Sequence, residues 1–209
     1  MLLPFLLVIV YLILNYGKSA SHLLVNQWHS TEADTFFKYV THLGDGAVFP
    51  IVIIILAFSR LRWALYELVA ALMTLFFVFI TKKIIFKGLP RPTKYFEDQE
   101  TLHLVEGVKM HEWNSFPSGH TITAFAIFII LVLIVKNNYL KVLFMTIAIL
   151  AGFSRVYLSQ HFLIDVFTGA IIGSLIAVFS CALVDQLKLL NESKWIDKSL
   201  TQIFAKNHE

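Results

Sequence analysis

"WNSFPSGHTITAFAIF", residues 113–128, places a proline, a serine, a glycine and a histidine directly before a long apolar run. Ser118 can cap a helix that starts here, and Gly119 lets backbone amides approach an anion closely. The start of a helix binds anions through free N–H groups and its dipole, so His120 would stand beside the anion, where a proton donor is useful. The alternative interpretation is a helix cap followed by a histidine at the membrane interface.

The composition is that of an integral membrane protein. The 209 residues are 57% hydrophobic and 15% charged, with a mean hydropathy of +0.72, whereas soluble domains are about 45–50% apolar and about 25% charged. The formal net charge of +3 gives no indication of nucleic-acid binding. The single cysteine, Cys181, lies in the last apolar run and is interpreted as a packing residue. We therefore expect one membrane domain over residues 1–209.

Six apolar stretches approach the roughly 20 residues that a membrane-spanning helix needs. The first lacks a basic leading region and a clean cleavage site, so we expect it to be retained rather than removed as a signal peptide. The second has a short apolar core, and its alternative is a half-buried or re-entrant segment. The predicted fold is all-α, a bundle of six transmembrane helices with an interfacial loop or short helix between helices three and four. The stretches are residues 2–22, 46–59, 62–86, 118–136, 139–159 and 162–185.

Loop cations give the orientation, although their raw numbers on the two sides nearly balance. The short loops "SRLR" (59–62) and "KNNYLK" (136–141) carry cations without acids, and such loops weigh most. We therefore expect both termini in the cytoplasm, with the chain integral to the cell (inner) membrane. The segments that follow spans one, three and five then share the outer, periplasmic side.

A second polar cluster, "SRVYLSQHFLID" (154–165), follows the fifth span. His161 and Asp165 are four residues apart, which places them on one face if a helix starts here. A carboxylate that accepts a hydrogen bond from one imidazole nitrogen leaves the other with an exposed lone pair, suited to a nucleophile or base. Arg155 supplies a forked guanidinium for a phosphate-like anion. The alternative is a His–Asp pair at a helix end beside a snorkelling arginine.

A third cluster, "KKIIFKGLPRP" (82–92), follows the third span. Lys83, Lys87 and Arg91 lie four residues apart, although the glycine and prolines indicate that the helix breaks. The alternative is a basic stop that touches anionic lipid head groups. With six spans all three clusters emerge on one side, where ionisable groups at membrane depth are costly and normally functional. Their shared requirement is a phosphate, with cations for its oxygens, one histidine to attack and another to protonate the leaving oxygen.

The motifs "PSGH" and "SR-x5-H-x3-D" resemble those of the type 2 phosphatidic acid phosphatase superfamily, which includes bacterial lipid phosphatases, glucose-6-phosphatase and vanadium haloperoxidases. The resemblance has its motif core at 83–165. The first family motif is Lys, six residues, then Arg-Pro, and Arg91-Pro92 fits its end. The lysine position falls on Ile84, so a one-residue bulge would bring in Lys83, with Lys87 as the reserve candidate.

The resemblance implies a role for each site residue. His161 attacks phosphorus and forms a phosphohistidine, Asp165 orients it, and His120 protonates the leaving group. No metal or other cofactor is implied, because fixed cations neutralise the transition state. The phosphate-binding residues would be Lys83 or Lys87, Arg91, Ser118, Gly119 and Arg155.

The implied activity is metal-independent hydrolysis of a lipid phosphate ester or pyrophosphate, with membrane lipids and the lipid phosphate as the partners. The preferred substrate is undecaprenyl pyrophosphate, because the site is expected to face outward, where that carrier is recycled. The enzyme alternatives are phosphatidylglycerol phosphate, phosphatidic acid and lipid A phosphate. The non-enzyme alternative is an anion or lipid transporter. A haloperoxidase is disfavoured because those enzymes are soluble.

The segment 93–115 between the first two clusters mixes aromatic and acidic residues. We interpret it as an interfacial lid or short helix over the site, with a plain surface connection as the alternative. His103 and His111 stand near several acids in this segment, but their spacing matches no metal-ligand pattern.

Overall fold

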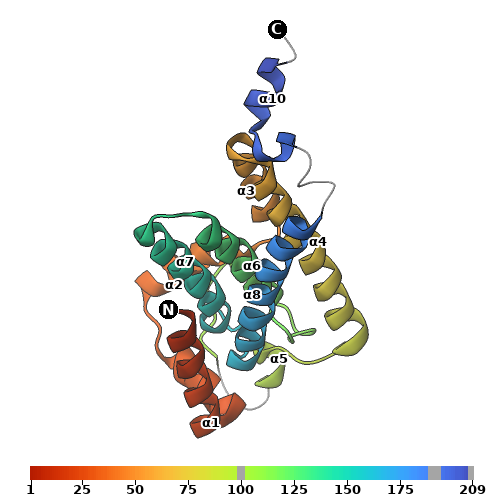
Figure 1. The fold of residues 1–209 in the computed structure, drawn as a ribbon. Coiled ribbons are helices and arrows are strands. Elements are labelled where there is room, and N and C mark those ends of the chain that lie inside the picture. Colours follow the sequence, from red (N-terminus) through yellow and green to blue (C-terminus); the bar gives the residue numbers. More distant parts are fainter. Residues whose placement is uncertain (98–101, 188–193, 207–209) are drawn as a thin grey trace.

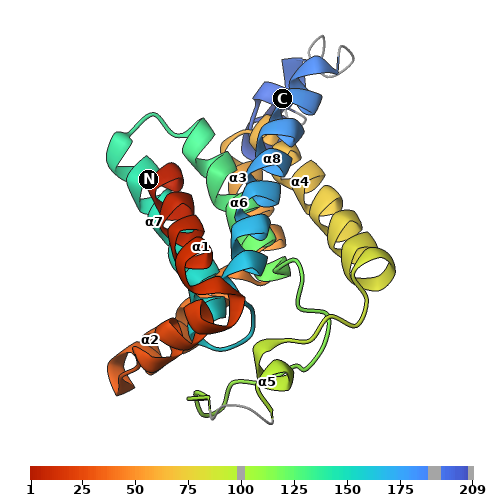
Figure 2. The ribbon, with the colours of Figure 1, turned by 90° about the horizontal axis from the view of Figure 1, so that it is seen from below.

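The computed structural model describes residues 1–97, 102–187 and 194–206, which form a helical bundle (Figures 1 and 2). The long helices are α1 (Leu2–Gln27), α4 (Leu61–Ile80), α6 (Gly119–Ile134), α7 (Asn138–Tyr157) and α8 (Leu163–Gln186). The short helical elements are α2 (Thr31–Val40), η1 (Thr41–Gly44), α3 (Val48–Ser59), η2 (Thr81–Ile85), α5 (Pro92–Tyr95), η3 (Lys194–Asp197) and α10 (Leu200–Lys206).

Polar side chains in the sequence determine where several helices begin. Ser118 caps α6 by accepting the Thr121 amide, and Asn137 caps α7 by accepting the amides of Tyr139 and Leu140. Such side chains satisfy amides that have no partner within the helix. The apolar stretches that follow then continue as helices, as predicted.

Four described helices are long and apolar enough to cross a membrane: Leu2–Gln27, Leu61–Ile85, Asn138–Tyr157 and Leu163–Gln186. The pair Thr31–Gly44 and Val48–Ser59 is bent by 62° and adds a fifth crossing if it is one broken span. The predicted count of six is therefore not confirmed. The predicted second span is the 12-residue α3, about 18 Å long against a hydrocarbon core of about 30 Å.

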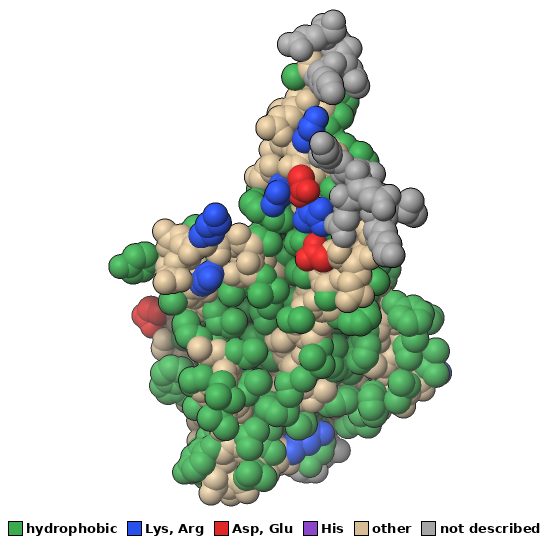
Figure 3. All heavy atoms as spheres, in the orientation of Figure 1, with side chains coloured by type: hydrophobic (Ala, Val, Ile, Leu, Met, Phe, Trp, Pro, Cys, Tyr) green, Lys and Arg blue, Asp and Glu red, His purple; other side chains and the backbone are tan. Residues whose placement is uncertain are grey.

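The chain is an integral membrane protein, and its surface shows why. Apolar side chains cover most of the face seen in Figure 3, and charged side chains gather mainly toward the end that carries α10. Large apolar side chains point outward from the spans, with Leu14 79% exposed and Leu75 71% exposed. Water would penalise such exposure, whereas lipid tails do not.

The core lies along α6, which packs between α7 and α8, with α4 on the remaining side (Figure 1). Every residue from Thr121 to Ile130 is buried. An apolar helix surrounded on all sides needs no polar face, which explains why this sequence run is hydrophobic throughout. The first turn of α6 is thereby held at a fixed place in the bundle.

Candidate active site

The starts of α6 and α8 lie side by side. The Ser118 amide donates to the Asp165 carbonyl oxygen at 3.1 Å, which joins the two helix starts directly. Gly169 permits the close approach, since a Cβ there would lie 2.9 Å from the Ser118 carbonyl oxygen. Two sequence clusters that are far apart along the chain therefore meet at one point.

His161 lies just before α8 and pairs with Asp165 in the first turn of that helix. Its Nδ1 lies 3.3 Å from Asp165 Oδ2, and both side chains are almost fully buried. The same carboxylate oxygen accepts the Ser115 hydroxyl at 2.5 Å and the Phe162 amide at 3.0 Å. A carboxylate held in this way keeps the proton of His161 on Nδ1 and leaves the Nε2 lone pair available.

The surroundings of His161 keep its imidazole neutral. Burial and the nearby cations Arg91, Lys82 and Arg155 lower the pKa of His161 well below its ordinary value. A protonated imidazole cannot attack phosphorus, so a lowered pKa preserves the nucleophile at neutral pH.

The cations gather around a polar cavity of about 420 Å³. Lys82, Arg91 and Arg155 line it together with the two histidines that were predicted to be catalytic, His120 and His161. These residues come from η2, the loop that follows it, α6, α7 and the loop before α8. The three clusters predicted to converge do so in this cavity.

The two arginines are held in place by hydrogen bonds that use only part of each guanidinium. Arg91 Nε donates to the Trp113 carbonyl oxygen at 3.0 Å, and Arg91 Nη1 donates to Gln160 Oε1 at 3.2 Å. Arg155 Nη1 donates to Thr41 Oγ1 at 2.6 Å, and Nη2 donates to Gln160 Oε1 at 3.4 Å. Burial lowers the pKa of Arg91, but a guanidinium remains charged in proteins. The two guanidinium groups, held in place by these hydrogen bonds, are suited to bind phosphate oxygens.

The lysine that the basic cluster 82–92 places at the cavity is Lys82, whereas Lys83 and Lys87 were the residues predicted from the family spacing. Lys82 lines the cavity and donates to the Asn114 carbonyl oxygen at 3.1 Å, while Lys83 and Lys87 are exposed. The physical reason is η2 (Thr81–Ile85), a π-helical turn that changes which side chains face inward. A count of residues along a regular helix cannot anticipate this change.

Ser118 and Gly119 lie at the helix start as predicted, with different surroundings. The Ser118 hydroxyl is fully buried and accepts the Thr121 hydroxyl at 2.8 Å and the Thr121 amide at 3.4 Å. Gly119 lines a neighbouring apolar cavity. The structure therefore gives Ser118 a capping contact, and contact of either residue with phosphate remains a prediction.

His120 has a partner that the sequence reasoning missed. Its Nε2 lies 2.7 Å from Asp45 Oδ1, and the other carboxylate oxygen of Asp45 lies 2.9 Å from His42 Nδ1. Asp45 stands at the end of η1 in "THLGDGAVFP" (41–50), just before an apolar stretch. An ionisable residue at the edge of a span was the available signal. Other residues at the site that the sequence reasoning missed include Thr41, Lys82, Ser115 and Gln160.

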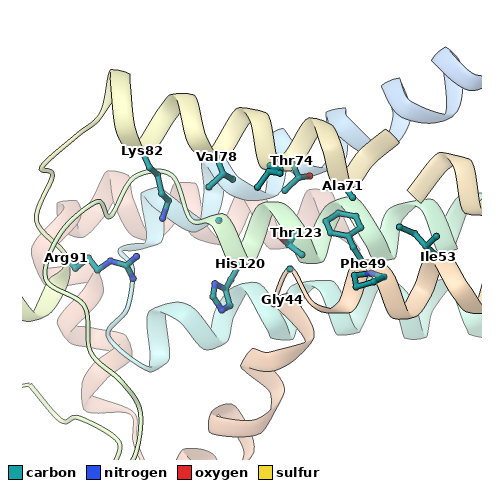
Figure 4. A pocket seen from close by; sticks show the side chains of 14 residues that line it. Gly44, Phe49, Ile53, Ala71, Thr74, Val78, Lys82, Arg91, His120 and Thr123 are labelled. Carbon is teal, nitrogen blue, oxygen red and sulfur yellow. The ribbon is translucent and has the colours of Figure 1, made fainter. Parts of the chain in front are cut away.

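An apolar cavity of about 530 Å³ adjoins the polar one. It shares Lys82, Arg91 and His120 with the polar cavity (Figure 4). Its other end runs between α3, α4 and α6, where Phe49 and Ile53 lie in Figure 4. The cations of the polar cavity and the apolar cavity therefore both adjoin the imidazole of His120.

The segment after Arg91 covers part of the polar cavity, which its residues Gly107, Val108, Lys109 and His111 line. It is tied to α1 and α2, since His103 Nε2 lies 2.8 Å from Asp34 Oδ2 and Asn26 Oδ1 accepts the His103 amide at 2.9 Å. Residues 98–101 of the predicted lid lie outside the described residues. Within the described ranges, no three His, Cys, Asp or Glu side chains come close enough to hold a metal ion.

Comparisons with known proteins identify a family and several relatives. The model of the PAP2 superfamily matches residues 63–188. "Bacitracin transport permease protein BcrC" from Bacillus licheniformis is 34% identical over 103 residues, which is 48% of this chain and 49% of that protein. The match thus spans about half the length of that relative.

Two solved structures are similar in fold. LpxE from Aquifex aeolicus aligns with a TM-score of 0.70 at 29% identity, covering 79% of this chain and 94% of LpxE. A PAP2 type phosphatidylglycerolphosphate phosphatase from Bacillus subtilis aligns with a TM-score of 0.57 at 23% identity, covering 90% of this chain and 96% of that one. The second likeness concerns the fold alone.

Proposed function

Because this chain belongs to the PAP2 superfamily, we propose that it removes a phosphoryl group from a membrane lipid through a phosphohistidine on His161. The observation that carries the proposal is the shared cavity. It brings two imidazoles and the cations of Lys82, Arg91 and Arg155 around a space of about 420 Å³. Such a site can bind a phosphoryl group and supply both a nucleophile and a proton donor.

In the first step, Nε2 of His161 attacks phosphorus and the bond from phosphorus to the leaving oxygen breaks. His120 transfers a proton to that oxygen, so the leaving group departs as an alcohol or a lipid phosphate. Lys82, Arg91 and Arg155 neutralise the phosphoryl oxygens as charge builds up. Their positions are set before the substrate arrives, which limits the reorganisation that the reaction requires.

In the second step, water hydrolyses the phosphohistidine. His120, now neutral, accepts a proton from the attacking water, and the N–P bond breaks to release inorganic phosphate. Asp165 and Ser115 hold His161 in the same tautomer in both steps. The enzyme returns to its starting protonation state without a cofactor.

The apolar cavity supports a substrate with a hydrocarbon chain. It opens between helices of the bundle and ends at Lys82, Arg91 and His120. A lipid could place its chain there, with the scissile oxygen beside His120 and the phosphoryl group among the cations. A chain in an apolar site replaces water contacts with packing contacts, which favours lipid phosphates over water-soluble esters.

Undecaprenyl pyrophosphate remains the preferred substrate. Five cationic side chains line the polar cavity, which also contains one carboxylate: Lys38, Lys82, Arg91, Lys109 and Arg155, with Asp45. A pyrophosphate carries more negative charge than a phosphate monoester, so this excess of cations supports it. Phosphatidylglycerol phosphate, phosphatidic acid and lipid A phosphate are the alternatives. We place the site on the outer side of the membrane, with both termini in the cytoplasm.

Phosphate release by the purified protein in detergent tests the proposal. The panel contains the four lipid phosphates named above, and His161→Gln is compared with His29→Gln, which removes an exposed imidazole. Loss of a nucleophile costs on the order of 10⁴-fold or more, whereas the control should stay within about threefold, the range of a surface change. A lipid labelled with ³²P should leave an acid-labile label on wild type but not on His161→Gln. Release of phosphate by His161→Gln at the wild-type rate would contradict the mechanism.

A transporter of anionic lipids or anions is the second candidate, favoured by the name of the relative from Bacillus licheniformis, which denotes a transport permease. Proteoliposomes distinguish the two functions. A transporter would move an intact lipid phosphate between leaflets and release no inorganic phosphate, and the His161→Gln variant would retain that movement.

A further inference from the structure

The second histidine of the site is paired with a carboxylate from a distant part of the chain. His120 Nε2 lies 2.7 Å from Asp45 Oδ1. Asp45 lies outside residues 63–188, the part of the chain that matches the family model. We propose that Asp45 is a positioning residue that holds His120 with Nδ1 toward the leaving oxygen and stabilises its protonated form. This inference rests on the proposed function and extends it.

The turn that carries Asp45 is fixed against the site by close packing. Gly44 lies against the backbone of His120, because a Cβ at Gly44 would stand 2.8 Å from the His120 carbonyl oxygen. On the other side of the same turn, the Thr41 hydroxyl accepts Arg155 Nη1 at 2.6 Å. The turn is thus docked on both α6 and α7. This docking holds the backbone of Asp45 next to His120.

The pairing determines which nitrogen of His120 is available. With Nε2 donating to Asp45, Nδ1 is the nitrogen that can donate to a substrate oxygen. The His161–Asp165 pair uses the opposite nitrogen, since there Nδ1 faces the carboxylate. Each imidazole is therefore oriented by its own aspartate, so that one can attack phosphorus while the other protonates the departing oxygen.

The carboxylate of Asp45 carries the same sign of charge as a phosphate and repels it, so its presence in the phosphate-binding cavity requires a chemical explanation. Stabilising an imidazolium provides one, since burial and the nearby cation Arg155 disfavour the charged form of His120 and the ion pair with Asp45 at 2.7 Å opposes them. In the first step the Nδ1 proton moves to the leaving oxygen as the N–P bond to His161 forms. In the second step neutral Nδ1 takes a proton from the attacking water, and Asp45 remains ionised throughout.

The test exploits the difference between leaving groups. A lipid alkoxide is a strong base and needs a proton as it departs, whereas the nitrophenolate of p-nitrophenyl phosphate does not. We expect Asp45→Asn to lower kcat/KM for the lipid phosphate by about 10²-fold, within the range of general acid catalysis, and kcat/KM for p-nitrophenyl phosphate by less than about fivefold. This constant covers the steps as far as departure of the leaving group and leaves out the hydrolysis of the phosphohistidine, which both substrates share. A merely structural role of Asp45 would lower both rates by the same factor.

The matched control is Asp34→Asn, which removes the carboxylate of another Asp–His pair, with His103 at 2.8 Å. This variant should leave the ratio of the two rates unchanged. Equal losses on both substrates in Asp45→Asn, or no loss on either, would overturn the inference alone. If Asp45→Asn shows no cooperative thermal unfolding, Asp45→Glu is measured by the same criterion, because it keeps the charge and moves the carboxylate. No phosphate release by wild type would overturn the proposed function and this inference with it.

Discussion

Replacing Lys82 by methionine tests whether the structure identifies the correct lysine. Lys82 donates one hydrogen bond, to the Asn114 carbonyl oxygen at 3.1 Å, which leaves its other N–H groups for phosphoryl oxygens. Its stem lies against the start of α6, with Cε 3.9 Å from the position of a Cβ on Gly119. Methionine retains much of this apolar stem and removes the ammonium, so the variant isolates the effect of charge.

The expected magnitude follows from the number of cations at the cavity. Arg91 and Arg155 remain in the variant, so binding of phosphate should weaken without being lost. Loss of one preorganised donor to transition-state charge costs about 2.7–4 kcal/mol, or about 10²–10³-fold in kcat. Lys83→Met is the matched control, because Lys83 is the adjacent residue and is exposed. Its rate should stay within about threefold of wild type.

The assay is steady-state phosphate release in detergent, with inhibition by vanadate as a second measurement. Vanadate resembles pentavalent phosphorus and should bind more weakly to Lys82→Met than to Lys83→Met. Equal rates in the two variants, or a larger loss in Lys83→Met, would refute the assignment of Lys82 to the phosphate site.

Three further predictions concern the nucleophile and the core. Ser115→Ala should lower kcat, measured as phosphate release, by about tenfold. The substitution removes the 2.5 Å hydrogen bond that holds Asp165, and a hydrogen bond to a charged group contributes about 1.5–3 kcal/mol. The pKa of His161 is lowered in the fold, so the unfolded chain binds more protons than the folded chain below about pH 6.5. Stability therefore falls as the pH decreases through that value. Between about pH 7 and about pH 5, the midpoint of thermal unfolding should fall less for His161→Gln than for wild type. Glu67 is fully buried without a hydrogen-bond partner among the described residues, so Glu67→Leu should raise the unfolding midpoint in detergent, gaining about 1–3 kcal/mol, and a lowered midpoint would contradict this.

The joining of the two cavities has a consequence for specificity. A substrate chain in the apolar cavity and a phosphoryl group in the polar one must be connected by an oxygen near His120, which both cavities share. Esters without a chain lose the apolar contacts and should therefore have a higher KM than lipid esters of the same leaving-group chemistry. Binding energy from the chain thus contributes to placing the phosphorus.

Local sequence determined the helices and much of the site. The apolar runs and the caps at Ser118 and Asn137 could be recognised from residue types alone, because helix formation and capping depend on neighbours along the chain. The spacing of His161 and Asp165 likewise brought a carboxylate within reach of an imidazole. The family motifs identified Arg91, His120 and Arg155 for the same reason, since each lies inside a short continuous pattern.

Tertiary structure alone decided which residues complete the site. The π-helical turn at the end of α4 places Lys82 rather than Lys83 at the cavity, and the number of spans depends on how the bent pair of α2–η1 and α3 crosses the membrane. Asp45 reaches His120 because Gly44 lets its turn dock on α6. Contacts between distant segments depend on how helices pack against one another, and packing reflects the shape of the whole bundle rather than the order of neighbouring residues.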